Sequence, residues 1–229
     1  MSVNRRIQIS ENSVTVSNFT VDNTQPQVLS LNWKANREIP ADGWTIRYSV
    51  NGVNAPSAIT ATQNAVQVPV VPNGEYIFTI QDSLGNTALG GPFTHAQGSA
   101  SAFENYNVAK TDITPRLCKT PSSSSWSYKD LKEEDYVNTF SVGQKISTVL
   151  ALAKAPANSD DSIVVTFAIY DENDQLVSFS HISQTWQSMW YQNYCELDIP
   201  VVPSEVGTYN VIVYFNGAEA GAQKFAITA

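Results

Sequence analysis

Two histidines, His95 and His181, are the side chains of this 229-residue chain that could act as a base at neutral pH. Serine and aspartate are abundant, so a Ser–His–Asp set can always be imagined, but no Gly-x-Ser-x-Gly elbow supports a serine nucleophile. A triad is made by geometry, and composition alone does not make one. No spacing selects two carboxylates for glycoside cleavage. We therefore expect no catalytic residue and no enzyme.

Metal and cofactor chemistry has few candidates in this sequence. Residues 171–174 carry hard oxygen ligands, but they lack the glycine and the closing glutamate of an EF-hand, which favours an acidic hairpin tip. Two cysteines, Cys118 and Cys195, and two distant histidines are too few for a zinc site. No glycine-rich phosphate loop is present. We expect no metal and no cofactor, and we expect two free thiols in preference to a disulfide.

The most unusual stretch for binding is residues 185–194, whose five large side chains do not follow the alternation of a strand. Some of them should point away from a core, and exposed aromatic and methionine side chains are enriched in interfaces and stack on sugars. The alternative is that Trp190 plugs the end of a domain and the others cover a contact between domains. Two arginines of an N-terminal arm are a second candidate for contact. The predicted partner-binding residues are therefore Trp186, Met189, Trp190, Tyr191, Tyr194, Arg5 and Arg6.

An internal repeat indicates which elements hold these side chains. Residues 68–72 read Val-Pro-Val-Val-Pro and residues 199–203 read Ile-Pro-Val-Val-Pro, and each run leads to a Gly-x-Tyr that ends at Tyr76 or Tyr209. Proline lacks an N–H and marks a strand edge or loop, and glycine lets the chain turn tightly. The pattern predicts two β-sandwiches, each closed by a tyrosine corner in which the hydroxyl binds upstream backbone.

Composition limits the partners that the chain can have. The formal net charge is 13 − 21 = −8, and both halves are acidic, which argues against nucleic acid and against an anionic membrane surface. The 24 aromatic residues are enough for two cores. The N-terminal residues lack the apolar core of a secretory signal, and no apolar run approaches the length of a membrane span.

Three spaced patterns over about residues 14–95 resemble the fibronectin type III family. The resemblance implies that Trp33 is the buried tryptophan of the second strand and that Tyr76 is the tyrosine corner, and it carries over no catalytic residue. The glycine-rich stretch Ser83–Gly91 departs from the family, so the last strand is expected to be short or irregular. The patterns are Leu29-x-Leu31-x-Trp33, Gly43-Trp44-x-Ile46-x-Tyr48 and Pro72-x-Gly74-x-Tyr76-x-Phe78-x-Ile80.

The second half resembles a generic bacterial or viral immunoglobulin-like repeat, in architecture only. We expect a Pro- and Ser-rich loop over Thr114–Trp126 and one or two helical turns over Lys129–Asp135. The chain is thus predicted to be all-β, with two tandem immunoglobulin-like or fibronectin III-like sandwiches. The expected parts are an arm (1–13), a fibronectin III-like sandwich (14–96), a linker (97–108) and an immunoglobulin-like sandwich (109–229).

These resemblances imply a non-enzymatic structural or binding protein. Our first hypothesis is a bacteriophage virion component, a capsid decoration or auxiliary protein that contacts capsid or neighbouring virion subunits. It is favoured because the chain, beginning at Met1, looks whole and shows no export signal. The alternative is a bacterial cell-surface or secreted accessory module that binds carbohydrate or protein. An enzyme domain is the third and least favoured hypothesis.

Overall fold

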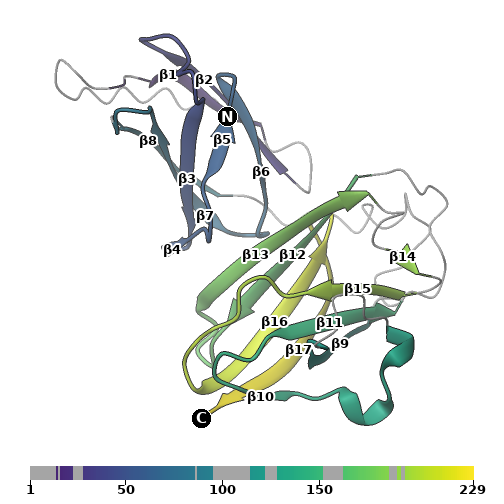
Figure 1. The fold of residues 1–229 in the computed structure, drawn as a ribbon. Helices are drawn as coiled ribbons and strands as arrows, with labels where there is room; N and C mark the ends of the chain where they lie inside the picture. Colours follow the sequence, from purple (N-terminus) through teal and green to yellow (C-terminus); the bar gives the residue numbers. More distant parts are fainter. Residues whose placement is uncertain are drawn as a thin grey trace. The chain divides into compact units, whose positions relative to one another are not determined.

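The structure is a computed structural model, and strands make up almost all of the regular secondary structure of its described residues (Figure 1). The chain divides into two compact units, residues 1–97 and 98–229, and each is described by itself. The prediction of an all-β fold is confirmed. No helical segment in the described ranges is long and apolar enough to cross a membrane. The structure describes residues 14, 16–22, 28–85, 87–94, 114–121, 128–151, 162–185, 190–191 and 194–229.

Two antiparallel sheets build the first unit. One has the order β1-β2-β6, formed by β1 (Val16–Asp22), β2 (Val28–Ala35) and β6 (Ala65–Pro69). The other has the order β4-β3-β7-β8, and β5 also pairs with β3. Its strands are β3 (Trp44–Val50), β4 (Val53–Asn54), β5 (Ile59–Ala61), β7 (Glu75–Gln81) and β8 (Thr87–Thr94).

The core of the first unit follows the alternation of the sequence. In β3 and β7 every second residue is buried, because successive side chains of a strand point to opposite faces. Trp33 is 4% exposed and Trp44 is fully buried. The Trp44 indole N–H donates to Oδ1 of Asn64 at 2.8 Å. The core rings that contact one another are Phe19, Tyr48, Tyr76, Phe78 and Phe93.

The last strand of the first unit is irregular, as expected, but it is not short. β8 has eight residues, and its register against β7 shifts between Tyr76 and Phe78. Gly91 lies at this shift with φ of +128°. A Cβ there would come within 2.7 Å of the Tyr76 carbonyl oxygen, so only glycine fits this close approach.

The second unit also has two sheets. One has the order β10-β17-β16-β12-β13 and the other β14-β15-β11-β9. The pairing of β10 with β17 is parallel, whereas the other described pairs of this unit are antiparallel. The strands are β9 (Thr114–Lys119), β10 (Thr139–Ser141), β11 (Ile146–Ala151), β12 (Ser162–Tyr170), β13 (Leu176–Thr185), β14 (Trp190–Tyr191), β15 (Tyr194–Asp198), β16 (Gly207–Phe215) and β17 (Ala218–Thr228).

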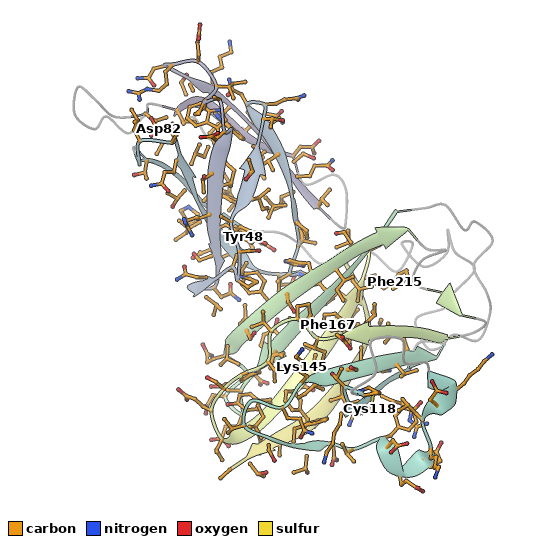
Figure 2. All side chains as sticks on the ribbon, viewed as in Figure 1. Tyr48, Asp82, Cys118, Lys145, Phe167 and Phe215 are labelled. Atoms are coloured by element: carbon orange, nitrogen blue, oxygen red, sulfur yellow. The ribbon has the colours of Figure 1, made fainter. Side chains whose placement is uncertain are left out.

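The core of the second unit lies between these sheets. Phe167 of β12 and Phe215 of β16 are among its buried side chains (Figure 2). The expectation of a loop over Thr114–Trp126 is wrong at its start, because residues 114–119 form β9. The expected helical turns are two 3₁₀ turns, Tyr128–Asp130 and Glu133–Asp135.

The two repeated tyrosines bind backbone upstream of themselves. The Tyr76 hydroxyl accepts from the Val71 N–H and donates to the Val71 carbonyl at 3.2 Å. The Tyr209 hydroxyl donates to the Glu205 carbonyl at 3.0 Å. Tyr76 is fully buried and Tyr209 is 8% exposed. Both contacts have the geometry of a tyrosine corner.

The glycine before each tyrosine has a different role from the one expected. In the first copy the left-handed residue of the turn is Asn73, with φ of 61°, and Gly74 is not in the left-handed region. A Cβ on Gly74 would lie 2.9 Å from the Val71 carbonyl oxygen and 3.1 Å from the Tyr76 ring. A Cβ on Gly207 would lie 3.1 Å from the Tyr209 hydroxyl. A side chain at either position would therefore crowd the tyrosine, and at Gly74 it would also meet the Val50 side chain at 2.5 Å.

Candidate functional site

Most of the predicted partner-binding residues fall outside the described residues. This holds for Arg5, Arg6, Trp186 and Met189. Of the others, Trp190 and Tyr191 form β14 and Tyr194 begins β15, so that they belong to a hairpin at one edge of the four-stranded sheet. Tyr191 stands opposite Tyr194 in the register. Their role in binding stays a prediction.

The histidine that the structure describes is held inside the second unit. His181 on β13 stands opposite Thr166 on β12, and its Nδ1 lies 2.9 Å from the Thr166 hydroxyl. Its Nε2 is buried and has no hydrogen-bond partner in the described part of the chain. Burial lowers the pKa of His181 to about 4. His95 lies outside the described residues.

The Thr166–His181 pair has the distance of a nucleophile and its base, but it lacks the rest of such a site. Thr166 is 1% exposed, so a substrate does not reach its hydroxyl. In a working triad a third group orients the histidine through its other ring nitrogen, and the described residues place none there. The pair therefore has the character of a structural contact between two neighbouring strands.

The acidic turn between β12 and β13 is held by hydrogen bonds among its own residues. Asp171 Oδ1 accepts from the backbone N–H groups of Asn173 and Gln175, each at 2.9 Å. These hydrogen bonds, first of all the one from Gln175, lower the pKa of Asp171. Asp174 has the left-handed φ of 57° that a tight hairpin needs. Among the described residues no group of three or more His, Cys, Asp or Glu side chains could hold a metal ion.

The Cys118 thiol is buried and is not part of a disulfide bond, as predicted, whereas the side chain of Cys195 is not among those that the structure describes. The Sγ of Cys118 lies 3.7 Å from the Ser147 carbonyl oxygen on β11 and donates to it. Cys195 stands on β15, on the other side of β11. The buried Cys118 thiol therefore makes a structural contact between β9 and β11.

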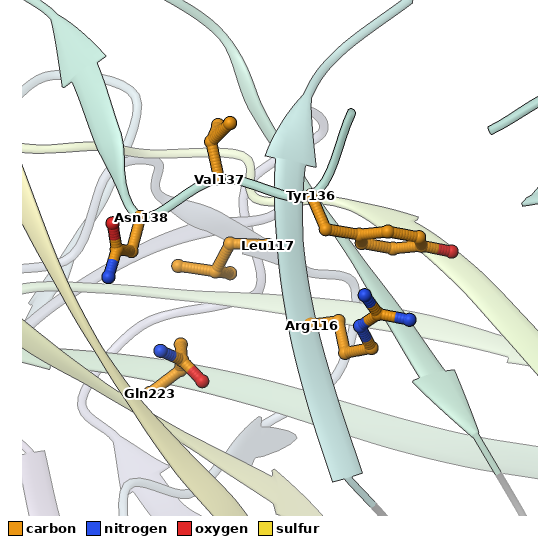
Figure 3. A pocket seen from close by; sticks show the side chains of 6 residues that line it. All are labelled: Arg116, Leu117, Tyr136, Val137, Asn138 and Gln223. Carbon is orange, nitrogen blue, oxygen red and sulfur yellow. The ribbon is translucent and has the colours of Figure 1, made fainter. Parts of the chain in front are cut away.

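The second unit has a cavity among its described residues, where the two sheets meet at β9 and β17. It is a hollow of about 280 Å³, here named the seam hollow. The segment 136–138 closes it on one side, because the Val137 N–H donates to the Leu117 carbonyl and the Ala226 N–H donates to the Asn138 carbonyl. Its lining residues are Arg116, Leu117, Tyr136, Val137, Asn138 and Gln223 (Figure 3).

One side of the seam hollow is fixed by an ion pair. Both terminal nitrogens of Arg116 donate to the Glu133 carboxylate, at 3.1 and 2.7 Å. The guanidinium carbon also lies 3.6 Å from the centre of the Tyr136 ring. The hydrogen bond and the charge of Arg116 lower the pKa of Glu133. Because both side chains are exposed, the pair orients Arg116 more than it stabilises the fold.

The other side of the seam hollow presents amides above an apolar floor. Figure 3 shows Asn138 and Gln223 on the opposite side of the β9 ribbon from Tyr136, with Leu117 between them. Leu117 is buried, whereas Asn138 is exposed. No local sequence pattern predicts this site, because its residues come from three segments that lie far apart in the chain. The pairing of β10 with β17 is what brings them together.

Comparison with known proteins gives structural matches and nothing else. No protein family and no curated protein sequence matches the chain. The FN1-FN3 domains of chicken CNTN1 match at 10% identity and a TM-score of 0.30, over 93% of this chain and 64% of that one. A two-domain fibronectin type III segment of chicken tenascin matches at 12% identity and a TM-score of 0.28, over 93% and 99%. Fibronectin(III)-like modules of CbhA from Clostridium thermocellum match at 10% identity and a TM-score of 0.25, over 92% and 93%. Likeness at this level transfers no binding site to the chain.

Proposed function

We propose that this chain is a non-enzymatic structural and binding protein. The observation that carries the proposal is the lining of the seam hollow, which contains no Ser, Thr, Cys, His, Asp or Glu side chain. Such a lining offers no serine, threonine or cysteine nucleophile and no carboxylate or imidazole base. It offers amides, a guanidinium, a phenol and an apolar floor, which are groups that hold a ligand.

Several polar side chains outside the seam hollow are engaged in contacts within their own unit, which supports the same proposal. Arg37 pairs with the buried carboxylate of Asp82 at 2.7 Å. The Ser147 hydroxyl donates to Asp198 and lies 2.7 Å from the Thr120 hydroxyl. These contacts link neighbouring strands or loops of one unit. The charged and hydroxyl side chains named here therefore stabilise the fold.

As the specific role, we propose a bacteriophage virion component that decorates a capsid and displays immunoglobulin-like domains. What supports it is a tandem of small acidic sandwiches with an aromatic hairpin at a sheet edge, which suits contact with capsid or neighbouring subunits. The alternative is a cell-surface or secreted module that binds carbohydrate or protein. The seam hollow supports that alternative, since a volume of about 280 Å³ has room for a ligand much smaller than a protein.

Immunogold labelling separates the two roles. An antibody against the purified chain is applied to cells that encode it and to the particles that they release. Gold on the heads of phage-like particles is the expected result. Gold on the cell envelope, or antigen only in the particle-free medium, would overturn the virion role in favour of the alternative.

A second test addresses the aromatic hairpin. The double variant Trp190→Ala, Tyr191→Ala should cosediment poorly with the particles while its circular dichroism spectrum stays that of the parent chain. The matched control is Val142→Ala with Val177→Ala, which truncates two exposed apolar residues elsewhere in the same unit. Equal cosedimentation of both folded double variants would remove the hairpin from the contact.

A further inference from the structure

We propose that the seam hollow binds a neutral sugar residue, held by the side-chain amides of Asn138 and Gln223 above Leu117. The inference rests on the proposed binding function and names the ligand of one site. It is carried by three properties of the hollow: the hydrogen-bonding capacity of its amides, its charge and its size.

Both amide side chains have hydrogen-bonding atoms that no described residue occupies. The Asn138 side chain makes no hydrogen bond with the described residues, although its backbone carbonyl accepts from Ala226. Gln223 donates through Nε2 to the Lys224 carbonyl at 3.1 Å, and its Oε1 has no partner in the described ranges. A primary amide both donates and accepts, and so does a hydroxyl. Two amides that flank an apolar floor therefore suit a ligand that carries several hydroxyls on a compact carbon ring.

The charge of the hollow disfavours an anion. Arg116 is the cationic side chain of the lining, and the carboxylate of Glu133 is bonded to both of its terminal nitrogens. A carboxylate or phosphate ligand would have to compete with Glu133 for the guanidinium. The chain also carries a net charge of −8, which repels anions at long range. A neutral ligand meets neither obstacle.

Size and strand pairing favour one sugar ring over a peptide strand. Pockets for drug-sized ligands measure about 300–1,000 Å³, and this hollow of about 280 Å³ is slightly smaller. A docked peptide needs a continuous free sheet edge. Here β10 already pairs with β17 at Ala226–Thr228, and Val137 already binds the Leu117 carbonyl of β9. The edges beside the hollow are therefore interrupted.

The test is an NMR titration of the whole ¹⁵N-labelled chain with glucose, galactose, mannose and N-acetylglucosamine. We expect at least one sugar to shift the amide signals of Leu117, Val137 and Gln223 in a saturable way. Asn138→Ala and Gln223→Ala should each weaken binding about fivefold, the equivalent of one hydrogen bond of about 1 kcal/mol. The control is Gln67→Ala, which truncates an exposed strand amide in the other unit and should leave the affinity unchanged.

Three results would overturn the proposal. One is the absence of saturable shifts with all four sugars, and another is binding that neither amide truncation weakens. The third is that N-methylacetamide, a mimic of the peptide group, shifts these signals while the sugars do not. Each result leaves the gold-labelling outcome untouched, so failure of the sugar site is distinguishable from failure of the virion role.

Discussion

Replacing Tyr76 with phenylalanine should destabilise the first unit much more than the equivalent change at Tyr209 destabilises the second. The Tyr76 hydroxyl is the acceptor for the Val71 N–H, and both residues are fully buried. The variant keeps the ring and removes only that oxygen. Water does not reach the N–H, so the donor is left without a partner.

The expected cost follows from counting the groups that lose a partner. The Val71 carbonyl keeps the hydrogen bond from the Gly74 N–H at 3.1 Å, so only the Val71 N–H is orphaned. An unsatisfied buried donor costs about 1–3 kcal/mol. The Tyr209 hydroxyl binds the carbonyl of the exposed residue Glu205, where water replaces it. Tyr209→Phe should therefore cost only about 0.5 kcal/mol, the low end for one net hydrogen bond.

Amide hydrogen exchange measured by mass spectrometry reports both units in one experiment. In Tyr76→Phe the slowest amides of β3 and β7 should exchange about 5- to 150-fold faster than in the parent chain, the equivalent of that free-energy range. Exchange in β12 and β16 should not change. The hydrogen-bond reasoning is refuted if Tyr209→Phe has the larger effect, or if Tyr76→Phe accelerates both units equally.

Three further changes test other contacts. The pKa of His181 is about 4 in the folded chain and 6.5 in the unfolded chain, so the unfolded chain takes up the proton first as the pH falls. The free energy of unfolding should therefore fall by about 3 kcal/mol between pH 6.5 and pH 4. In His181→Gln the urea midpoint should depend less steeply on pH. Gly74→Ala should lower the free energy of unfolding in urea by about 1–3 kcal/mol, because the new Cβ meets the Val50 side chain at 2.5 Å and the Val71 carbonyl oxygen at 2.9 Å. Gly207→Ala should lower it less, because the nearest atom to its new Cβ lies at 3.1 Å. Arg37→Met should cost about 1–3 kcal/mol in calorimetry, because the Asp82 carboxylate, 3% exposed, loses its cation; Arg37→Met with Asp82→Asn should recover part of the loss.

Strands with one buried face could be predicted from the sequence, because burial of every second residue requires apolar and polar residues to alternate along the strand. This applies to β2 and β3, in which the apolar residues named from the pattern are the buried ones. The loop expected over Thr114–Trp126 is wrong over residues 114–119, which form β9. Pro115 suggested a loop, but β9 is the edge strand of its sheet, where a residue without an N–H breaks no ladder on its outer side.

The seam hollow could not be predicted, because no local pattern encodes it. Glu133 lies 17 residues after Arg116 and begins the second 3₁₀ turn, and Gln223 comes from the last strand of the chain. Their meeting depends on the segment 136–141, which contacts β9 at Tyr136 and Val137 and then pairs with β17 as β10. Such an arrangement is set by the packing of a whole sandwich. The aromatic stretch 185–194 is the reverse case, since its sequence predicts a surface and most of its side chains lie outside the described residues.

The two copies of the repeat show which part of it is physically required. The first places one residue, Asn73, between the second proline and the glycine, whereas the second places Ser204-Glu205-Val206 there. The hydroxyl accordingly reaches Val71 in one unit and Glu205 in the other. What stays constant is a glycine two residues before the tyrosine, and in both units a Cβ added to that glycine would lie 3.1 Å from the tyrosine side chain. The spacing from proline therefore varies between the copies, whereas the Gly-x-Tyr spacing does not. Because the repeated tyrosines bind backbone within their own units, the repeat reports on folding. The proposed partner contacts instead come from residues 185–194 and the seam hollow, which have no counterpart in the repeated pattern.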